Sequence, residues 1–305
     1  MGRVMTTLLT AAVIAVLSLD ASPAQPQGKP PGTMSGSFAV SGIGQSQGDL
    51  AAGGDVEQGT FLVTGTLTRQ FVPAFWAGIT ARYSTEAWDF GSPAAFGGRS
   101  PWEHLQRPGV AVNLNLALSK SFVIGVSPGV EWPSEPGASP DDALIYGAVV
   151  SAFKVFGPDR VLGLGASVYQ QFYSVKTSPF LIVNWKLAER WRIANALAAG
   201  PEGGAGVELR YTVDPAWELA AGGVYRGDRY RLDEQGPFPG AVGETSSIPL
   251  FARASRKLGA AAKLDLYAGA MTFGQLRVKD DDGRELAADD VDPAAALAAT
   301  LSWKF

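Results

Sequence analysis

The chain ends in the stretch PAAALAATLSWKF, residues 293–305, in which apolar side chains alternate with small or polar ones. A period of two places Leu297, Leu301 and Trp303 on one face of a β-strand and Thr300 and Ser302 on the other. Segments with this alternation recur along the whole chain, whereas helical periodicity is almost absent. The sequence therefore predicts an all-β protein.

Fourteen segments carry the pattern, and each has about the length that a tilted strand needs to cross a bilayer. They are residues 35–43, 58–70, 74–86, 109–119, 121–132, 143–156, 160–174, 178–187, 190–198, 205–213, 216–231, 247–257, 260–275 and 293–305. Twelve strands are the alternative, because segments 178–187 and 190–198 are short.

The composition favours a membrane barrel over a soluble sheet. Of 305 residues, 46% are hydrophobic and only 18% charged, but no run after residue 24 reaches the ~20 apolar residues of a transmembrane helix. A sheet in hydrocarbon must close on itself so that every backbone group is paired. We therefore predict a transmembrane antiparallel up-and-down β-barrel. Six tryptophans near the predicted strand ends fit the bilayer interface: Trp76, Trp132, Trp185, Trp191, Trp217 and Trp303.

The connections alternate in length. Those after even-numbered strands are short, and most of the others are long, including residues 44–57, 87–108 and 276–292. Bacterial outer-membrane barrels have short periplasmic turns and long extracellular loops. The pattern predicts this orientation, with both ends of the barrel domain in the periplasm.

The first residues indicate export. Arg3, an apolar run over residues 8–19 and the small residues 22–24 are typical of a signal peptide. We predict a signal peptide over 1–24, a flexible leader over 25–34 and an outer-membrane barrel over 35–305.

The terminal Leu301, Trp303 and Phe305 resemble the signal that the barrel-insertion machinery reads in Gram-negative outer-membrane proteins. The C-terminal third, with Ile248-Pro249-Leu250-Phe251 and Leu264 to Gly269, then Asp281-Asp282-Gly283 and Asp292-Pro293, is similar to an uncharacterised family of bacterial outer-membrane barrels. That resemblance implies a fold and a location and no functional residues. Fourteen strands also resemble the channels for hydrophobic compounds, but the N-terminal hatch segment of those channels is absent from this chain.

Several functions conflict with the sequence. The chain has no Cys, a single His and a net charge of −4, which argues against thiol chemistry, multi-histidine metal sites and nucleic-acid binding. Ser100 and His104 fit no nucleophile motif, so we predict no enzyme and no cofactor. The acidic residues 280–292 are a solvated loop or a cation site; their spacing does not match an EF-hand.

The predicted inward face carries both acids and bases. The candidates are Arg82, Glu131, Lys186, Glu208, Arg210, Glu218, Arg226, Asp228, Arg253, Lys263 and Asp265, together with Asn113, Asn115 and Tyr267. They either form an electrostatic constriction or pair structurally within the wall. Our leading hypothesis is a passive or weakly selective channel for small solutes, with membrane lipid and lipopolysaccharide as surroundings. The alternative is a closed barrel that binds partners through loops 87–108 and 276–292.

Overall fold

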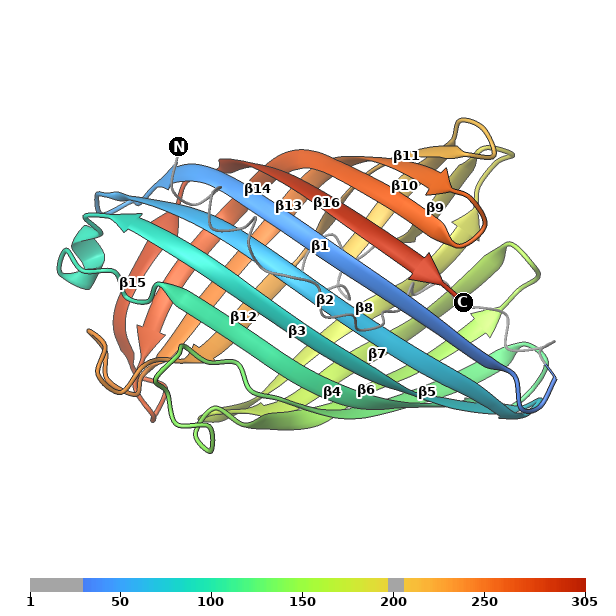
Figure 1. Cartoon of the computed structure of the whole chain (residues 1–305), viewed down its shortest axis with the longest axis horizontal. Helices are drawn as coiled ribbons and strands as arrows, with labels where there is room; N and C mark the ends of the chain where they lie inside the picture. The colour runs from blue at the N-terminus through green and yellow to red at the C-terminus, as the bar shows by residue number, and fades with distance from the viewer. Residues whose placement is uncertain (1–29, 197–205) are drawn as a thin grey trace.

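A computed structural model describes residues 30–196 and 206–305, which form one closed antiparallel sheet (Figure 1). The predicted signal peptide, the first half of the leader (25–29), and residues 197–205 lie outside the described residues. The strands are β1 (Met34–Asp49), β2 (Asp55–Val72), β3 (Phe75–Gly91), β4 (His104–Ala117), β5 (Phe122–Glu131), β6 (Ile145–Val155), β7 (Arg160–Gln171), β8 (Ser174–Lys186), β9 (Trp191–Asn195), β10 (Gly206–Thr212), β11 (Trp217–Val224), β12 (Arg226–Arg231), β13 (Val242–Leu258), β14 (Ala262–Lys279), β15 (Glu285–Val291) and β16 (Ala294–Lys304). One helical turn, η1 (Ala94–Phe96), lies between β3 and β4.

These sixteen segments make a wall of fourteen strands. β11 and β12 follow one another along β13, and β15 and β16 follow one another along β14, so each pair counts as one strand of the wall. β1 pairs with β16, and β13 pairs with β14, which closes the sheet. The predicted fold class and the fourteen strands are confirmed, and the alternative of twelve is wrong.

The predicted inward and outward faces are confirmed in the part of the wall nearer the short turns. Leu164, Leu266 and Leu297 point outward and are 69%, 50% and 69% exposed, as lipid-facing side chains are in a barrel without its bilayer. One of the six tryptophans predicted at the bilayer interface does not face lipid. Trp76 points into the barrel and packs against the small cluster of Val123, Phe153 and Val161. No helix among residues 30–196 and 206–305 has the length and apolar character to cross a membrane.

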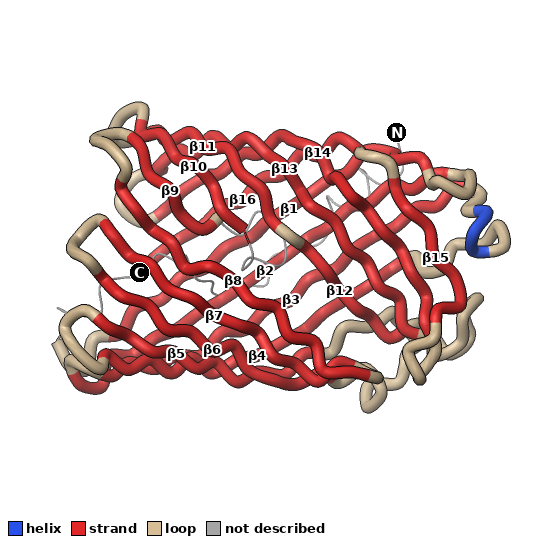
Figure 2. Tube along the Cα trace, turned by 180° about the vertical axis from the view of Figure 1, so that it is seen from behind, coloured by secondary structure: helices blue, strands red, loops and turns tan. Residues whose placement is uncertain are grey.

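The two ends of the barrel differ, as Figure 2 shows. One end, the short-turn end, has connections as brief as residues 73–74 and 259–261. The other, the long-loop end, carries residues 92–103, 132–144 and 232–241.

The strands are longer at the long-loop end than the sequence predicts. The expected loop 44–57 is reduced to residues 50–54, and the expected loop 276–292 is mostly strand, because β14 continues to Lys279 and β15 begins at Glu285. The polarity of the faces inverts there. Leu276 and Val278 point inward and are buried, while outward positions carry polar residues such as Arg277. Above the bilayer the outer face of the strands meets water and the inner face is dry. The strands therefore keep alternating, but with polar side chains outward and apolar side chains inward.

The long-loop end forms a second, narrower ring. Ser134 pairs with Gln106 of β4 on one side and Arg231 of β12 on the other, and Leu50 pairs with Val291 of β15. With the ladders already described, these bridges join β12, β13, β14, β15, β1, β2, β3 and β4 into a closed ring of eight strands. A barrel of about eight strands is just wide enough for side chains to fill. The fourteen-stranded wall therefore narrows to a section that can be packed solid.

Candidate functional site

The narrow ring is filled by an apolar cluster, which we call the plug. Residues 92–103 leave β3, fold into the ring and return to β4, and they place Phe96 and Trp102 at its centre, 4% and 1% exposed. The Trp102 ring meets Trp88 and Phe90 edge-on, with centroids 5.8 and 5.9 Å apart. The remaining buried members are Leu50, Val56, Leu105, Tyr230, Leu232, Ala241, Leu276 and Val278. The region predicted as a partner-binding loop thus contributes its largest side chains to the interior.

The plug is tied down by main-chain hydrogen bonds at both ends of its segment. The amide of Trp88 donates to the carbonyl of Glu103 at 2.8 Å, and the amide of Ala94 donates to the carbonyl of Gly53 at 3.0 Å. These bonds hold residues 92–103 to the rim of the ring. The other buried members of the plug lie on the strands of the ring or next to them, so only the part that residues 92–103 contribute can be displaced while the ladders stay intact.

A layer of buried charges lies beneath the plug; we call it the transverse cluster. The guanidinium of Arg107 on β4 donates to the Asp228 carboxylate on β12 at 2.6 Å. The Tyr230 hydroxyl donates to Glu86 of β3 at 2.9 Å, and the Arg226 guanidinium lies 3.6 Å from the same carboxylate. Charge-assisted hydrogen bonds of this kind are the strong ones, provided that their partners are satisfied.

These contacts join two strands that are distant around the wall but close in the narrow ring. β4 is seven strands from the β11–β12 strand in either direction around the fourteen-stranded wall, and Ser134 bridges β4 to β12 within the ring. Arg107 and Asp228 are only 6% and 3% exposed, and no solvated gap separates them. Glu86 also accepts hydrogen bonds from Gln58 at 2.8 Å and from the Trp88 indole at 3.0 Å. The transverse cluster therefore holds β4 and β12 together where the wall narrows, and it connects directly to the plug.

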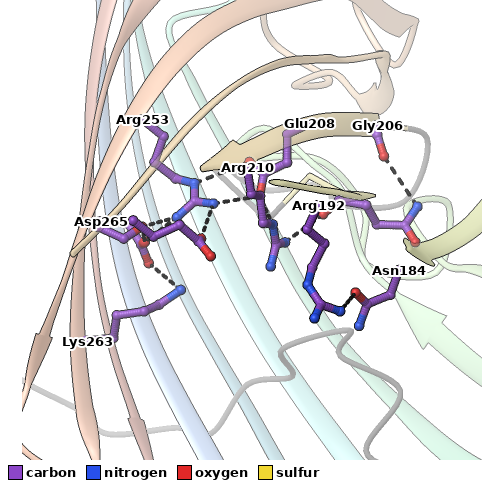
Figure 3. A network of polar contacts seen from close by, with 11 residues as sticks. Asn184, Arg192, Gly206, Glu208, Arg210, Arg253, Lys263 and Asp265 are labelled. Carbon is purple, nitrogen blue, oxygen red and sulfur yellow. Dashed lines mark hydrogen bonds and ion pairs between the residues drawn. The ribbon is translucent and has the colours of Figure 1, made fainter. Parts of the chain in front are cut away.

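A second ionic group, which we call the basal cluster, is drawn in Figure 3. Its central Arg253 lies five residues before the end of β13 at Leu258, and so nearer the short-turn end. Arg253 on β13 has a fully buried side chain and contacts Glu208 at 2.6 Å, Glu218 at 2.9 Å and Asp265 at 3.0 Å. Arg210 contacts Glu208 at 2.5 Å, and Lys263 contacts Asp265 at 3.1 Å. The strands involved, β10, β11, β13 and β14, are neighbours, and three bases balance three acids. This cluster lines the wall and does not cross the lumen.

Replacing Arg253 with alanine should destabilise the barrel strongly. Glu208 and Asp265, 0% and 3% exposed, would lose the buried guanidinium that they share and keep Arg210 and Lys263 as their remaining partners. Removing one partner of a buried pair typically costs about 3–5 kcal/mol. Urea unfolding, followed by intrinsic fluorescence in lipid vesicles, measures the loss.

The matched double variant Arg253→Ala/Glu208→Ala should recover part of that loss, because it also removes a buried carboxylate that has lost one of its two basic partners. An Arg253→Ala barrel as stable as the wild type would contradict a structural role for the basal cluster.

The structure places the sequence-predicted lumen residues in three groups. Arg226 and Asp228 belong to the transverse cluster. Arg82 contacts Glu131 at 3.2 Å on the wall below it, and Lys186 lies 3.7 Å from Asp159 at the short-turn rim. The other predicted charges, Glu208, Arg210, Glu218, Arg253, Lys263 and Asp265, form the basal cluster.

The most consequential residues were not predicted. Glu86 is the last residue of a predicted strand, and Arg107 and Trp102 fall within the predicted loop 87–108. The alternation of β3 could have indicated Glu86, because it continues past the predicted end of the strand. Ser84, Glu86 and Trp88 occupy every second position and all face inward beyond the bilayer.

The other candidate sites from the sequence have simple surroundings. His104 is exposed at the start of β4. Within the described residues, no three His, Cys, Asp or Glu side chains are grouped as metal ligands. In the acidic hairpin turn, the Asp280 carboxylate accepts the amides of Asp282 and Arg284, and Arg284 contacts Asp282 at 3.0 Å.

A hollow of about 310 Å³ opens between the long loops, directly outside the plug. Arg99, Glu103, His104 and Glu135 line it, and Trp102 lies against it. Glu135 accepts the amide of Asp233 at 3.0 Å, and burial raises the pKa of its carboxyl. The hollow is large enough for a small polar molecule, and the plug separates it from the lumen.

Comparison with known proteins supports the fold. No family model matches the chain, and no curated protein matches it. An outer-membrane channel from Pseudomonas putida F1 has a similar structure, with a TM-score of 0.50 at 11% identity over 94% of this chain and 100% of that one. A deltaS2S3 mutant of the TodX monoaromatic hydrocarbon channel aligns less well, with a TM-score of 0.44 at 9% identity over 90% and 91% of the two chains. The predicted resemblance to bacterial outer-membrane β-barrels is confirmed as a shared fold.

Proposed function

We propose that this protein is a small-solute channel of the bacterial outer membrane, in a closed state. The observation that carries the proposal is how the lumen is blocked. The wide fourteen-stranded section has small and polar inward side chains beside one apolar cluster around Val123 and Phe153. It narrows to a ring that residues 92–103, buried wall side chains and the transverse cluster fill. A barrel that served only as a scaffold would not need a wide section with polar inward side chains beneath a filled ring.

The lining of the wide section supports a path for polar solutes. Asn113, Asn115, Ser127, Ser151 and Ser167 face inward on β4 to β7 and stay partly exposed, so water reaches them from inside the barrel. Small and polar side chains of this kind line solute pathways and contribute little selectivity of their own. The basal cluster, on β10, β11, β13 and β14, carries no net charge. We therefore expect weak discrimination between cations and anions.

The orientation follows from the two ends. The short-turn end faces the periplasm and the long-loop end faces outward, as in other outer-membrane barrels. A solute from outside would first occupy the hollow between the loops and then pass the plug and the transverse cluster. Leu301, Trp303 and Phe305 serve as the signal for the insertion machinery; Trp303 packs against Phe38 of β1, with ring centroids 5.2 Å apart, where the barrel closes.

Solute uptake by proteoliposomes tests the proposal. The wild-type barrel should pass sugars and amino acids slowly, because the plug must leave first. A variant whose residues 93–102 are replaced by a short Gly-Ser linker should pass them much faster, with little preference between charged and neutral solutes. Swelling rates in an iso-osmotic assay give both the rate of uptake and the preference between charged and neutral solutes.

Each outcome bears on a separate part of the proposal. No uptake by either protein, both shown to be folded by heat-modifiable gel migration, would overturn the channel function. Equal and rapid uptake by both would keep the channel function and contradict the closed state.

A further inference from the structure

The outer face of the short-turn rim carries a group of stacked cations. Lys154 of β6 lies over the ring of Phe156, with its Nζ 5.2 Å from the centroid, and Arg160 of β7 lies over Trp185, with its Cζ 5.4 Å from the centroid. The two rings touch, with centroids 5.7 Å apart. Two positive charges are thus held on one aromatic surface. Stacking of this kind fixes a cation without removing its charge.

The same arrangement continues along the neighbouring strands. Trp191 of β9 packs against Tyr211 of β10 at 4.8 Å, and Arg190 donates to the Tyr211 hydroxyl at 3.4 Å. Arg256 of β13 lies over Trp217 of β11, 5.3 Å from the centroid. Since β6 to β11 and β13 are consecutive in the sheet, the cations form one continuous stripe. We call Lys154, Arg160, Arg190 and Arg256 the basic arc.

The arc faces away from the lumen, at the level where the bilayer meets water. Phe156, Trp191 and Trp217 are 51%, 43% and 39% exposed on the outer surface. Exposed aromatic rings at the ends of barrel strands mark the interface with the lipid headgroups. The cations stacked on these rings therefore lie at headgroup depth.

No carboxylate neutralises the main charges of the arc. Among the described residues, no ion pair joins Lys154, Arg160 or Arg256 to an acid. Two nearby acids are engaged elsewhere: Asp159 contacts Arg192 at 2.8 Å and Lys186 at 3.7 Å, and Asp214 accepts the amides of the turn before Trp217. Glu189 interacts with Arg190, the fourth member of the arc. At the other end of the barrel the outward positions carry both signs, with Glu57 and Asp89 paired across β2 and β3 and Arg277 on β14. Lys154, Arg160 and Arg256 are thus positive charges without an ion-pair partner at the short-turn end.

We propose that the basic arc binds the phosphate groups of anionic glycerophospholipids in the leaflet at the short-turn end. Lys154 and Arg160 form its strongest site, because their two cations flank one aromatic pair and can hold one phosphate between them. A lipid with a net negative charge should be preferred to a zwitterionic one, whose ammonium group repels the arc. The inference requires only a barrel in a bilayer and does not depend on conduction.

Native mass spectrometry of the full-length mature barrel tests it. The protein is extracted from vesicles of equal parts phosphatidylglycerol and phosphatidylethanolamine, and the retained lipids are counted. A basic residue near an anionic membrane surface changes partition by roughly fivefold. The variant Lys154→Gln/Arg160→Gln should therefore reduce the preference for phosphatidylglycerol by up to about 25-fold.

Two control variants separate charge from structure. Lys154→Arg/Arg160→Lys keeps both charges and should keep the preference, and Arg99→Gln, at the long-loop end, should leave it unchanged. Raising the salt concentration should weaken the preference of the wild type for phosphatidylglycerol, because salt screens the charges of the arc. This control needs no variant.

Three results would overturn the proposal: equal retention of both lipids by the wild type, an unchanged preference in Lys154→Gln/Arg160→Gln, or an equal loss in Arg99→Gln. A parallel extraction with lipid A added distinguishes the leaflets. If the glutamine variant loses lipid A and keeps phosphatidylglycerol, the arc serves a different lipid from the one proposed.

Discussion

Replacing Trp102 with alanine should convert the closed barrel into a conducting one. Trp102 is 1% exposed and contacts three other aromatic rings, Trp88, Phe90 and Phe96, at centroid distances of 5.8, 5.9 and 6.5 Å. It is one of the twelve buried side chains that fill the narrow ring, and the largest of those that are less than 2% exposed. Its removal leaves a space that the rigid ladders around it cannot close, and we expect a cost of about 3–5 kcal/mol in the packing of the plug.

The cost falls on the plug and not on the wall, because Trp102 belongs to a segment held by a few main-chain bonds. We therefore expect the barrel to stay folded and its extracellular end to open. Single-channel recording of Trp102→Ala should show sustained current where the wild type shows brief openings at most. Leu297→Ala is the matched control, since Leu297 is 69% exposed to lipid and far from the lumen. Trp102→Ala currents indistinguishable from those of Leu297→Ala would contradict the role of the plug.

Replacing Arg107 with alanine should have the second large effect, on stability and conduction together. The change leaves Asp228 buried at 3% exposure without the guanidinium 2.6 Å away. An orphaned buried charge costs about 3–5 kcal/mol. Arg107 also lies over the Tyr230 ring, 5.0 Å from its centroid, so the variant removes packing beneath the plug as well. Urea midpoints in vesicles and single-channel currents measure the two effects.

Arg192→Ala is the matched control for Arg107→Ala. Arg192 also faces inward, but it contacts Asn184 and Asp159 on its own side of the wall. Arg192→Ala should reduce stability less than Arg107→Ala does, and it should leave the channel closed. The double variant Arg107→Ala/Asp228→Ala should be more stable than Arg107→Ala alone and still conduct. If it conducts no more than the wild type, the transverse cluster does not hold the lumen closed.

The fold of the bilayer region was predictable because lipid imposes a simple rule. On β4, Val110, Val112 and Leu114 face hydrocarbon while Asn113 and Asn115 face the lumen, and no other arrangement satisfies both surroundings. The same rule explains where the prediction failed. Where β3 and β14 extend beyond the bilayer, their apolar residues face inward to the plug. Because the prediction required an apolar outer face, it assigned these ends of the strands to loops.

The closed lumen could not be predicted from local sequence. Ser134 completes the narrow ring by pairing with Gln106 and Arg231, and Arg107 meets Asp228 across 121 positions of the chain. Nothing in the residues around Ser134 indicates such a bridge. Charged residues on inward faces were recognisable, but whether they line a wall or cross the lumen depends on how the strands of the ring are brought together.

Accessibility of a single cysteine tests the closed lumen most directly, because the chain has none of its own. Ser151→Cys places a thiol on the inner face of β6, in the wide section and away from the plug. In vesicles with one barrel orientation, a membrane-impermeant maleimide should label it rapidly from the short-turn side and very slowly from the long-loop side. Adding Trp102→Ala should make labelling rapid from both sides. Rapid labelling from the long-loop side with Trp102 intact would contradict the closed channel described here.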